Sequence, residues 1–164
     1  RVLSDPQAIW LGAHEMAHQW WGNGVTNRSW RHFWLNEGIA TFMTAAYMEH
    51  RLGKEMYQRQ IDAARMKYYV VLDAGQDKPL VFLNWDSPTS ADRSLVYDKG
   101  ALVLHELRSL LGEETFWSGL KTYTKRHWGQ SVETADFVRA MEETSHQDLS
   151  VFFDQWIYAK QSVR

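Results

Sequence analysis

The stretch His14-Glu15-Met16-Ala17-His18 decides how the rest of the sequence is interpreted. On an α-helix, positions i and i+4 share one face and are separated by about 6 Å along the axis. Both imidazoles can therefore reach one metal ion at about 2.0–2.1 Å. Glu15 lies about 100° further round the helix, where a carboxylate can contact a water on the metal without occupying the metal. The alternative, two exposed histidines and a solvated glutamate, requires a chance match to this spacing.

A zinc ion held by two histidines needs a third protein ligand and one open position for catalysis. Glu37 is the best candidate because it stands in the largely apolar stretch Trp34-Leu35-Asn36-Glu37-Gly38. A carboxylate buried there costs free energy unless it is paired or bound to metal. In the simpler alternative, Asn36 caps a helix and Glu37 occupies its first turn. Two helices joined by a loop can bring Glu37 opposite His14 and His18.

Helical periodicity and helix-ending glycines predict a mainly helical chain, an all-α fold in a single domain over residues 1–164. A helix is expected to begin at Pro6 with Ser4 or Asp5 as its cap. The expected helices cover residues 6–21, 34–52, 54–72, 95–111, 113–127, 134–144 and 149–158. Residues 73–94 hold two of the three prolines and are expected to form a long surface loop. No segment predicts a strand.

Composition excludes several classes of function. The chain has 164 residues and a formal net charge of -2, which argues against nucleic acid as the main partner. It contains no cysteine, so disulfides, thiolate metal sites and cysteine nucleophiles are excluded. No apolar run is long enough to span a membrane. The cellular compartment stays open.

Longer motifs match a known family. The segments HEMAHQWWGN (residues 14–23) and VTNRSWRHFWLNEGIATFM (residues 25–43) resemble the gluzincin zinc aminopeptidases of the aminopeptidase N and leukotriene hydrolase type. The family pattern places eighteen residues between the second histidine and a glutamate inside Asn-Glu-Gly, and residues 19–36 fill that interval here. Tyr97-Asp98-Lys99-Gly100 is similar to the family's Tyr-x-Lys-Gly segment, and residues 136–137 and 148–156 resemble later helices. The resemblance covers essentially the whole chain.

The resemblance implies a fold and a set of roles. The fold would be the helical C-terminal lobe of a thermolysin-like zincin catalytic domain. His14, His18 and Glu37 would bind one Zn²⁺, Glu15 would be the general base, and Tyr97 would stabilise the tetrahedral intermediate. The activity would be removal of N-terminal residues from peptides. Spacing alone favours Tyr97 as an ordinary core aromatic.

The sequence also departs from the family. The Gly-x-Met-Glu-Asn segment that binds the substrate's amino terminus is absent, and only 13 residues precede His14. We therefore expect the chain to be a fragment of a longer multidomain enzyme. Its expected partners are a peptide substrate and the remaining domains of its own full-length chain. The fragment alone is expected to bind zinc but to be weakly active or inactive. Asp92 stands where leukotriene chemistry would use a tyrosine, so epoxide hydrolysis is not expected. A zinc endopeptidase and a non-catalytic scaffold remain alternatives.

Other histidines and the aromatic residues around the motif are expected to be structural. His105-Glu106 begins like the motif, but Ser109 supplies no second ligand. The remaining histidines are scattered and are expected to be structural or at the surface. The aromatic residues that flank the proposed ligands are expected to pack behind them; these are Trp20, Trp21, Trp30, Phe33 and Trp34.

Overall fold

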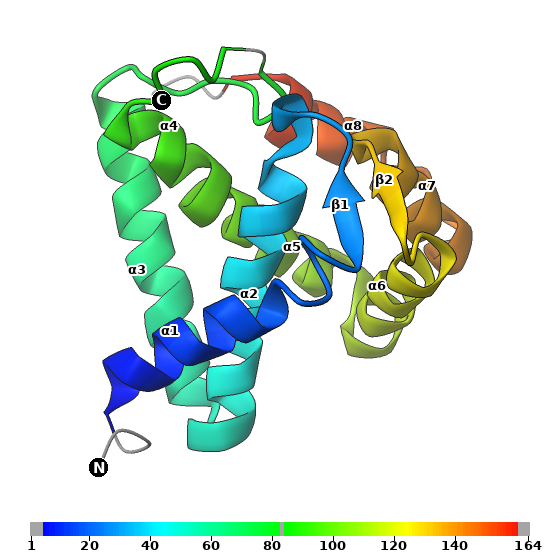
Figure 1. Cartoon of the computed structure of the whole chain (residues 1–164), viewed down its shortest axis with the longest axis horizontal. Coiled ribbons are helices and arrows are strands. Elements are labelled where there is room, and N and C mark those ends of the chain that lie inside the picture. Colours follow the sequence, from blue (N-terminus) through cyan, green and yellow to red (C-terminus); the bar gives the residue numbers. More distant parts are fainter. Residues whose placement is uncertain (1–4, 83, 161–164) are drawn as a thin grey trace.

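Helices make up nearly all the regular structure of the chain (Figure 1). The computed structural model describes residues 5–82 and 84–160. The long helices are α1 (Pro6–Ala17), α2 (Trp34–Leu52), α3 (Lys54–Asp73), α5 (Gly100–Leu111), α6 (Glu113–Arg126) and α7 (Thr134–Ser145). The short ones are the 3₁₀ turn η2 (Trp30–His32), α4 (Ser90–Ser94), α8 (Ser150–Phe153) and the π-helical turns η3 (Leu95–Lys99) and η4 (Asp154–Tyr158). The prediction of a mainly helical fold is confirmed.

The first helix begins where the sequence predicts and ends earlier. The Asp5 carboxylate accepts a hydrogen bond from the Gln7 backbone N–H at 3.0 Å, with Pro6 in the first turn. The expected continuation to residue 21 is wrong, because the chain leaves the helix after Ala17 in a series of tight turns. Gly22 then adopts φ +144°, a conformation that side chains disfavour.

Two short strands form a parallel pair that the sequence did not predict. β1 (Val25–Asn27) lies beside β2 (Gln130–Val132), with Val25 opposite Gln130. Each strand has only three residues, too few to show the alternation by which a strand is recognised. The pair joins the connection between α1 and α2 to the connection between α6 and α7 (Figure 1).

The expected loop over residues 73–94 ends earlier than predicted, since α4 begins at Ser90. A capping box starts this helix: the Asp92 N–H donates to the Thr89 hydroxyl at 3.1 Å, and the Thr89 N–H donates to the Asp92 carboxylate at 2.9 Å. The segment then runs through η3 into α5. The single helix expected over residues 95–111 is thus interrupted by a π-helical turn at its start.

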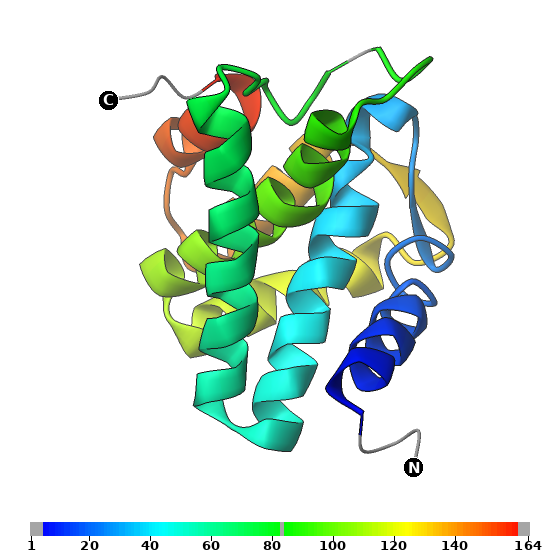
Figure 2. The same cartoon turned by 90° about the vertical axis from the view of Figure 1, so that its left-hand side faces the viewer.

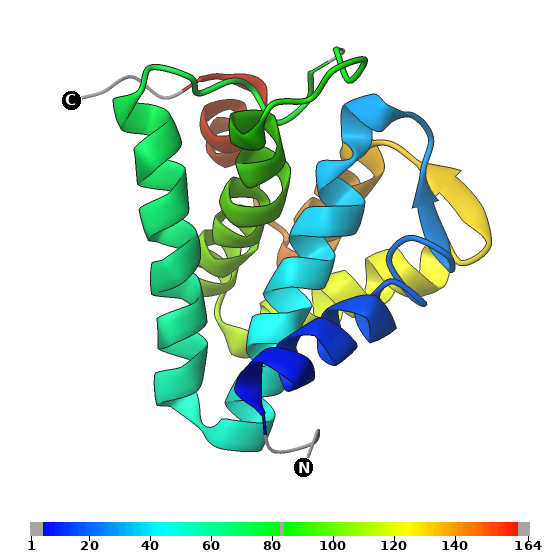
Figure 3. The ribbon, with the colours of Figure 1, turned by 60° about the vertical axis from the view of Figure 1, so that its left-hand side comes forward.

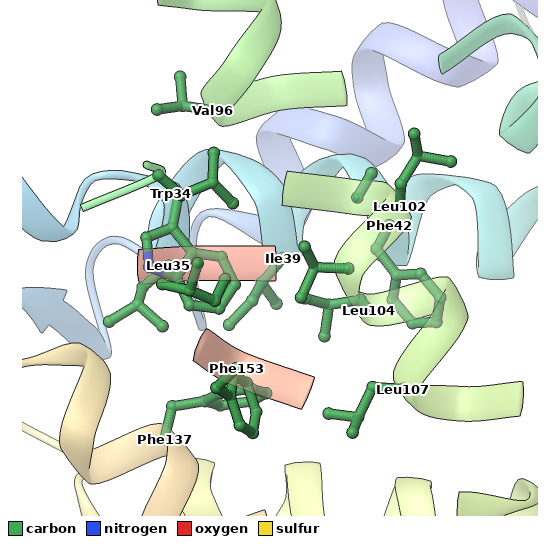
Figure 4. Packing of buried hydrophobic residues seen from close by; sticks show 14 of the residues in the cluster. Trp34, Leu35, Ile39, Phe42, Val96, Leu102, Leu104, Leu107, Phe137 and Phe153 are labelled. Atoms are coloured by element: carbon green, nitrogen blue, oxygen red, sulfur yellow. The ribbon is translucent and has the colours of Figure 1, made fainter. Parts of the chain in front are cut away.

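The core surrounds α2, which packs against α1, α3, α5 and η3 (Figures 2 and 3). α1 lies against α2 on the side away from α6 to α8. Figure 4 shows Trp34, Ile39 and Phe42 of α2 meeting Leu104 of α5 and Phe137 of α7 in the centre. These five side chains have at most 1% of their surface exposed. No helix in the described parts of the chain is both long and apolar enough to cross a lipid bilayer.

Candidate metal centre

The side chains of His14, His18 and Glu37 meet where α1 crosses the first turns of α2. His14 Nε2 lies 3.3 Å from Glu37 Oε2, and His18 Nε2 lies 3.3 Å from the same oxygen. The two Nε2 atoms are 3.1 Å apart. Three potential ligand atoms from two consecutive helices therefore form a nearly equilateral triangle.

This triangle has the dimensions that a tetrahedral zinc site requires. Ligands at about 2.0–2.1 Å from zinc in tetrahedral geometry are about 3.3 Å apart, so the edges match one face of the tetrahedron. Two imidazoles and one carboxylate also form a donor set typical of catalytic zinc. Within residues 5–82 and 84–160, no other three His, Asp or Glu side chains come together in this way.

The ring of His18 is already oriented for metal binding. Its Nδ1 lies 3.0 Å from the Trp21 carbonyl oxygen. A carbonyl only accepts, so Nδ1 carries a proton, and Nε2 is the nitrogen whose lone pair a metal would bind in place of a proton. Gly22 makes room for this arrangement, because a Cβ there would lie 3.1 Å from the His18 carbonyl oxygen and 3.3 Å from Nδ1.

His14 is more enclosed than His18, with 4% of its surface exposed. Trp10 stacks on its ring with centroids 5.1 Å apart, and Tyr97 stacks on it at 5.9 Å. Its Nδ1 has no hydrogen-bond partner among the described residues. The aromatic rings therefore fix the plane of His14 where hydrogen bonding does not.

The Glu37 carboxylate is held in its charged form. Burial alone would raise its pKa, but hydrogen bonds with His14 and then His18 lower the pKa of Glu37 to about 2. The hydrogen bond between His18 and Glu37 is also the main reason that the pKa of His18 is raised. A buried carboxylate that is ionised at neutral pH is a ready ligand for a cation.

Tyr97 lies in η3, beside the three potential ligands. Burial raises the pKa of Tyr97 to about 12, and the neighbouring Glu37 charge adds to the effect. Its hydroxyl therefore stays protonated at neutral pH and can donate a hydrogen bond. A π-helical turn is rare and is found disproportionately at functional sites.

Two glycines let the Tyr97 turn approach the Glu37 turn. A Cβ on Gly100 would lie 2.9 Å from the Cα of Gly38, and a Cβ on Gly38 would lie 3.0 Å from the Cα of Gly100. The first distance is shorter than real Cβ contacts, and the second is tighter than most of them. The backbones of α2 and α5 touch here only because neither residue has a side chain.

Glu15 is exposed and faces the same region. Its charge adds a smaller contribution to the pKa of His18, which is raised chiefly by the hydrogen bond with Glu37. It also adds to the pKa of Tyr97, after burial and Glu37. The carboxylate is accordingly near the triangle without forming part of it, as its position on the helix predicted.

Some expectations for the aromatic residues are wrong. Trp34 is fully buried, but Trp20 and Trp30 are 45% and 62% exposed and do not pack behind the ligands. The sequence also does not predict a junction at His32, whose Nδ1 lies 2.9 Å from the Thr134 hydroxyl and accepts the Thr134 N–H at 3.1 Å. Residues 102 positions apart share no local pattern that predicts such a contact.

Comparison with known proteins identifies the family. Residues 5–156 match the model of the peptidase family M1 domain. The chain belongs to peptidase family M1. It is 32% identical to aminopeptidase N of Lactococcus lactis over 161 residues, covering 95% of this chain and 19% of that protein. It is also 32% identical to leucine aminopeptidase 2 of Aspergillus oryzae over 173 residues, covering 96% of this chain and 27% of that protein.

Solved structures of M1 members share the fold. Yeast LTA4 hydrolase in complex with bestatin superposes with a TM-score of 0.81 and 25% identity, covering 96% of this chain and 27% of that one. An M1 zinc metallopeptidase of Deinococcus radiodurans bound to a Tyr-Ser-Ala substrate gives a TM-score of 0.74 and 26% identity, covering 90% and 32%. The chain therefore spans between about a fifth and a third of the length of these relatives.

Proposed function

We propose that this M1 chain binds one zinc ion through His14, His18 and Glu37 and takes part in removing N-terminal residues from peptides. The donor triangle is the observation on which the proposal rests. Its relatives are named aminopeptidases, and a structural neighbour is an M1 zinc metallopeptidase holding a tripeptide. A zinc ion bound there would supply a Lewis acid that makes water nucleophilic at neutral pH.

Glu15 would act as the general base. It stands beside the ligand face of α1 and is exposed, so it can accept a proton from the attacking water and pass the proton to the leaving amine. A carboxylate serves this purpose because it can accept a proton without itself being a ligand.

Tyr97 would donate a hydrogen bond to the peptide carbonyl oxygen as negative charge develops on it. A pKa of about 12 keeps the hydroxyl protonated through the reaction. Stacking against His14 fixes the ring, so the donor needs little reorganisation when the charge appears.

Zinc stoichiometry tests the proposal most directly. We expect one zinc per chain by elemental analysis, and strongly reduced metal content after His14→Ala or Glu37→Ala. Glu15→Gln should retain the zinc and, in the full-length enzyme, lose hydrolysis of an aminoacyl p-nitroanilide, because it removes only the base. A wild-type chain that binds no zinc would overturn the proposal, and loss of zinc in Glu15→Gln would contradict the role of Glu15.

Blocked substrates separate this function from its alternatives. An aminopeptidase should not cleave a peptide whose amino group is acetylated, whereas an endopeptidase should. The assays are made on the full-length protein, since this chain alone is expected to be weakly active or inactive; a zinc-loaded scaffold would cleave neither the free nor the blocked peptide.

A further inference from the structure

Lys99 is a fully buried lysine in the same π-helical turn as Tyr97. Its Nζ donates to both carboxylate oxygens of Asp77, at 2.9 and 3.2 Å, and to the Lys78 carbonyl oxygen at 3.1 Å. The ring of Tyr68 lies 5.3 Å from the same Nζ. A buried ammonium is costly unless it is paired and hydrogen-bonded, and here it meets both conditions.

A second ion pair joins Lys78, the residue after Asp77, to Asp92, which precedes Tyr97 in the sequence. Lys78 Nζ lies 2.6 Å from Asp92 Oδ1, and Asp92 is the residue whose carboxylate caps α4. Two adjacent residues, Asp77 and Lys78, thus hold the helical segment five positions before Tyr97 and two positions after it. We name the pairs Asp77–Lys99 and Lys78–Asp92 the double tie.

The double tie lies on both sides of Tyr97 in the sequence, so it can affect where the Tyr97 side chain points as well as stability. A π-helical turn carries one extra residue compared with an α-helical turn, and here the segment that carries Tyr97 is anchored on both sides of it by ion pairs to the adjacent residues Asp77 and Lys78. Burying an ion pair contributes little net stability compared with apolar residues of similar volume. The double tie therefore fixes a direction more than it adds free energy.

We propose that Asp77 and Lys99 are positioning residues that hold the Tyr97 ring against the metal centre. This inference rests on the proposed function, because it concerns the distance between Tyr97 and the metal that His14, His18 and Glu37 would bind. Neither Asp77 nor Lys99 touches the triangle; both act through the turn that carries Tyr97.

The test measures that distance without turnover. The chain is produced with 3-fluorotyrosine at its seven tyrosines, loaded with Co²⁺ and compared with its Zn²⁺ form by fluorine NMR. The Tyr97 resonance is assigned as the one missing in Tyr97→Phe. The variant Asp77→Asn/Lys99→Met removes both charges while keeping side-chain volumes similar, and Lys121→Met on the exposed face of α6 is the matched control.

We expect the cobalt-induced relaxation of the Tyr97 fluorine to fall in the variant and to stay unchanged in the control. A retreat of about 1 Å, a displacement large enough to impair catalysis, lowers this rate about twofold or more, because the effect falls with the sixth power of distance. Thermal unfolding and cobalt content are measured on the same samples.

Each outcome decides something. Undiminished relaxation in a folded, cobalt-loaded variant would overturn the positioning role and leave the metal centre standing. Failure of the wild-type chain to bind cobalt would overturn the proposed function, and the positioning role with it. If the double variant does not fold, Asp77→Asn alone, which removes one charge of the Asp77–Lys99 pair at nearly constant volume, replaces it, and the same decrease, smaller in size, is required of it.

Discussion

The contact between Gly38 and Gly100 makes a prediction that can be worked through from the structure. In Gly100→Ala the new methyl group would lie 2.9 Å from the Cα of Gly38. The obstacle is backbone inside a packed helix, so it cannot rotate away as a flexible side chain could. Relief requires α5 and the adjoining turn to move away from α2.

The expected cost follows from two opposing effects. Alanine is favoured over glycine inside a helix by about 1 kcal/mol. Overpacking a well-packed site costs about 1–3 kcal/mol, and the backbone obstacle places this site at the upper end. The net loss should be about 1–2 kcal/mol, and a chain of this size loses about 2–4 °C in Tm for each kcal/mol. We therefore expect a Tm about 2–8 °C lower.

Gly12→Ala provides the matched control. Gly12 lies within α1, and a Cβ there would have nothing within 4 Å. Only the helix preference applies, so its Tm should rise by about 2–4 °C. Both variants are unfolded thermally in EDTA, so that metal binding does not add to stability. A Gly100→Ala chain as stable as Gly12→Ala would refute the argument that these two backbones are in contact.

Three further predictions concern the site and its surroundings. Zinc at about 1,000 times its dissociation constant should stabilise the wild-type chain by about 4 kcal/mol and leave the Tm of His14→Ala nearly unchanged, which calorimetry would detect. In the full-length enzyme, Tyr97→Phe should lower kcat about 10²–10³-fold with the zinc content unaltered; an unaffected rate would return Tyr97 to a packing role. Burial lowers the pKa of His32 from its ordinary 6.5. As the pH falls, His32 therefore binds a proton in the unfolded chain before it does so in the folded chain. Stability supplied by the neutral ring, which accepts from Thr134, should therefore be intact above about pH 6.5 and decrease as the pH falls below it. Urea unfolding at pH 7 and pH 5 should show a smaller decrease for His32→Gln, and an equal decrease would exclude His32 as the cause.

The sequence predicts those features that depend on local spacing. The separation of His14 from His18 is one helical turn, and a helix brings them together whatever surrounds it. The start of α2 near Trp34 and its end before Gly53 follow from apolar periodicity and a glycine stop. The capping box of Thr89 and Asp92 was also readable, but the prolines around it favoured a loop over residues 73–94.

Features that depend on contacts between distant segments were not predictable. β1 and β2 lie 105 positions apart in register and are too short to carry a pattern of their own. Lys99 finds Asp77 across 22 positions, from a stretch that the sequence presents as weakly ordered. The carbonyl of Trp21 orients His18, but a backbone oxygen leaves no trace in residue type. In each case the partner is chosen by tertiary packing.

The placement of α1 has a consequence for the local opening of the chain. α1 packs mainly on α2. A cation shared between His14, His18 and Glu37 would hold the C-terminal end of α1 against the first turn of α2. Amide hydrogens of α1 should then exchange freely in the apo chain and slowly in the loaded one, while those of α5 change little. The ion would stabilise the packing of α1 on α2 as well as take part in the reaction.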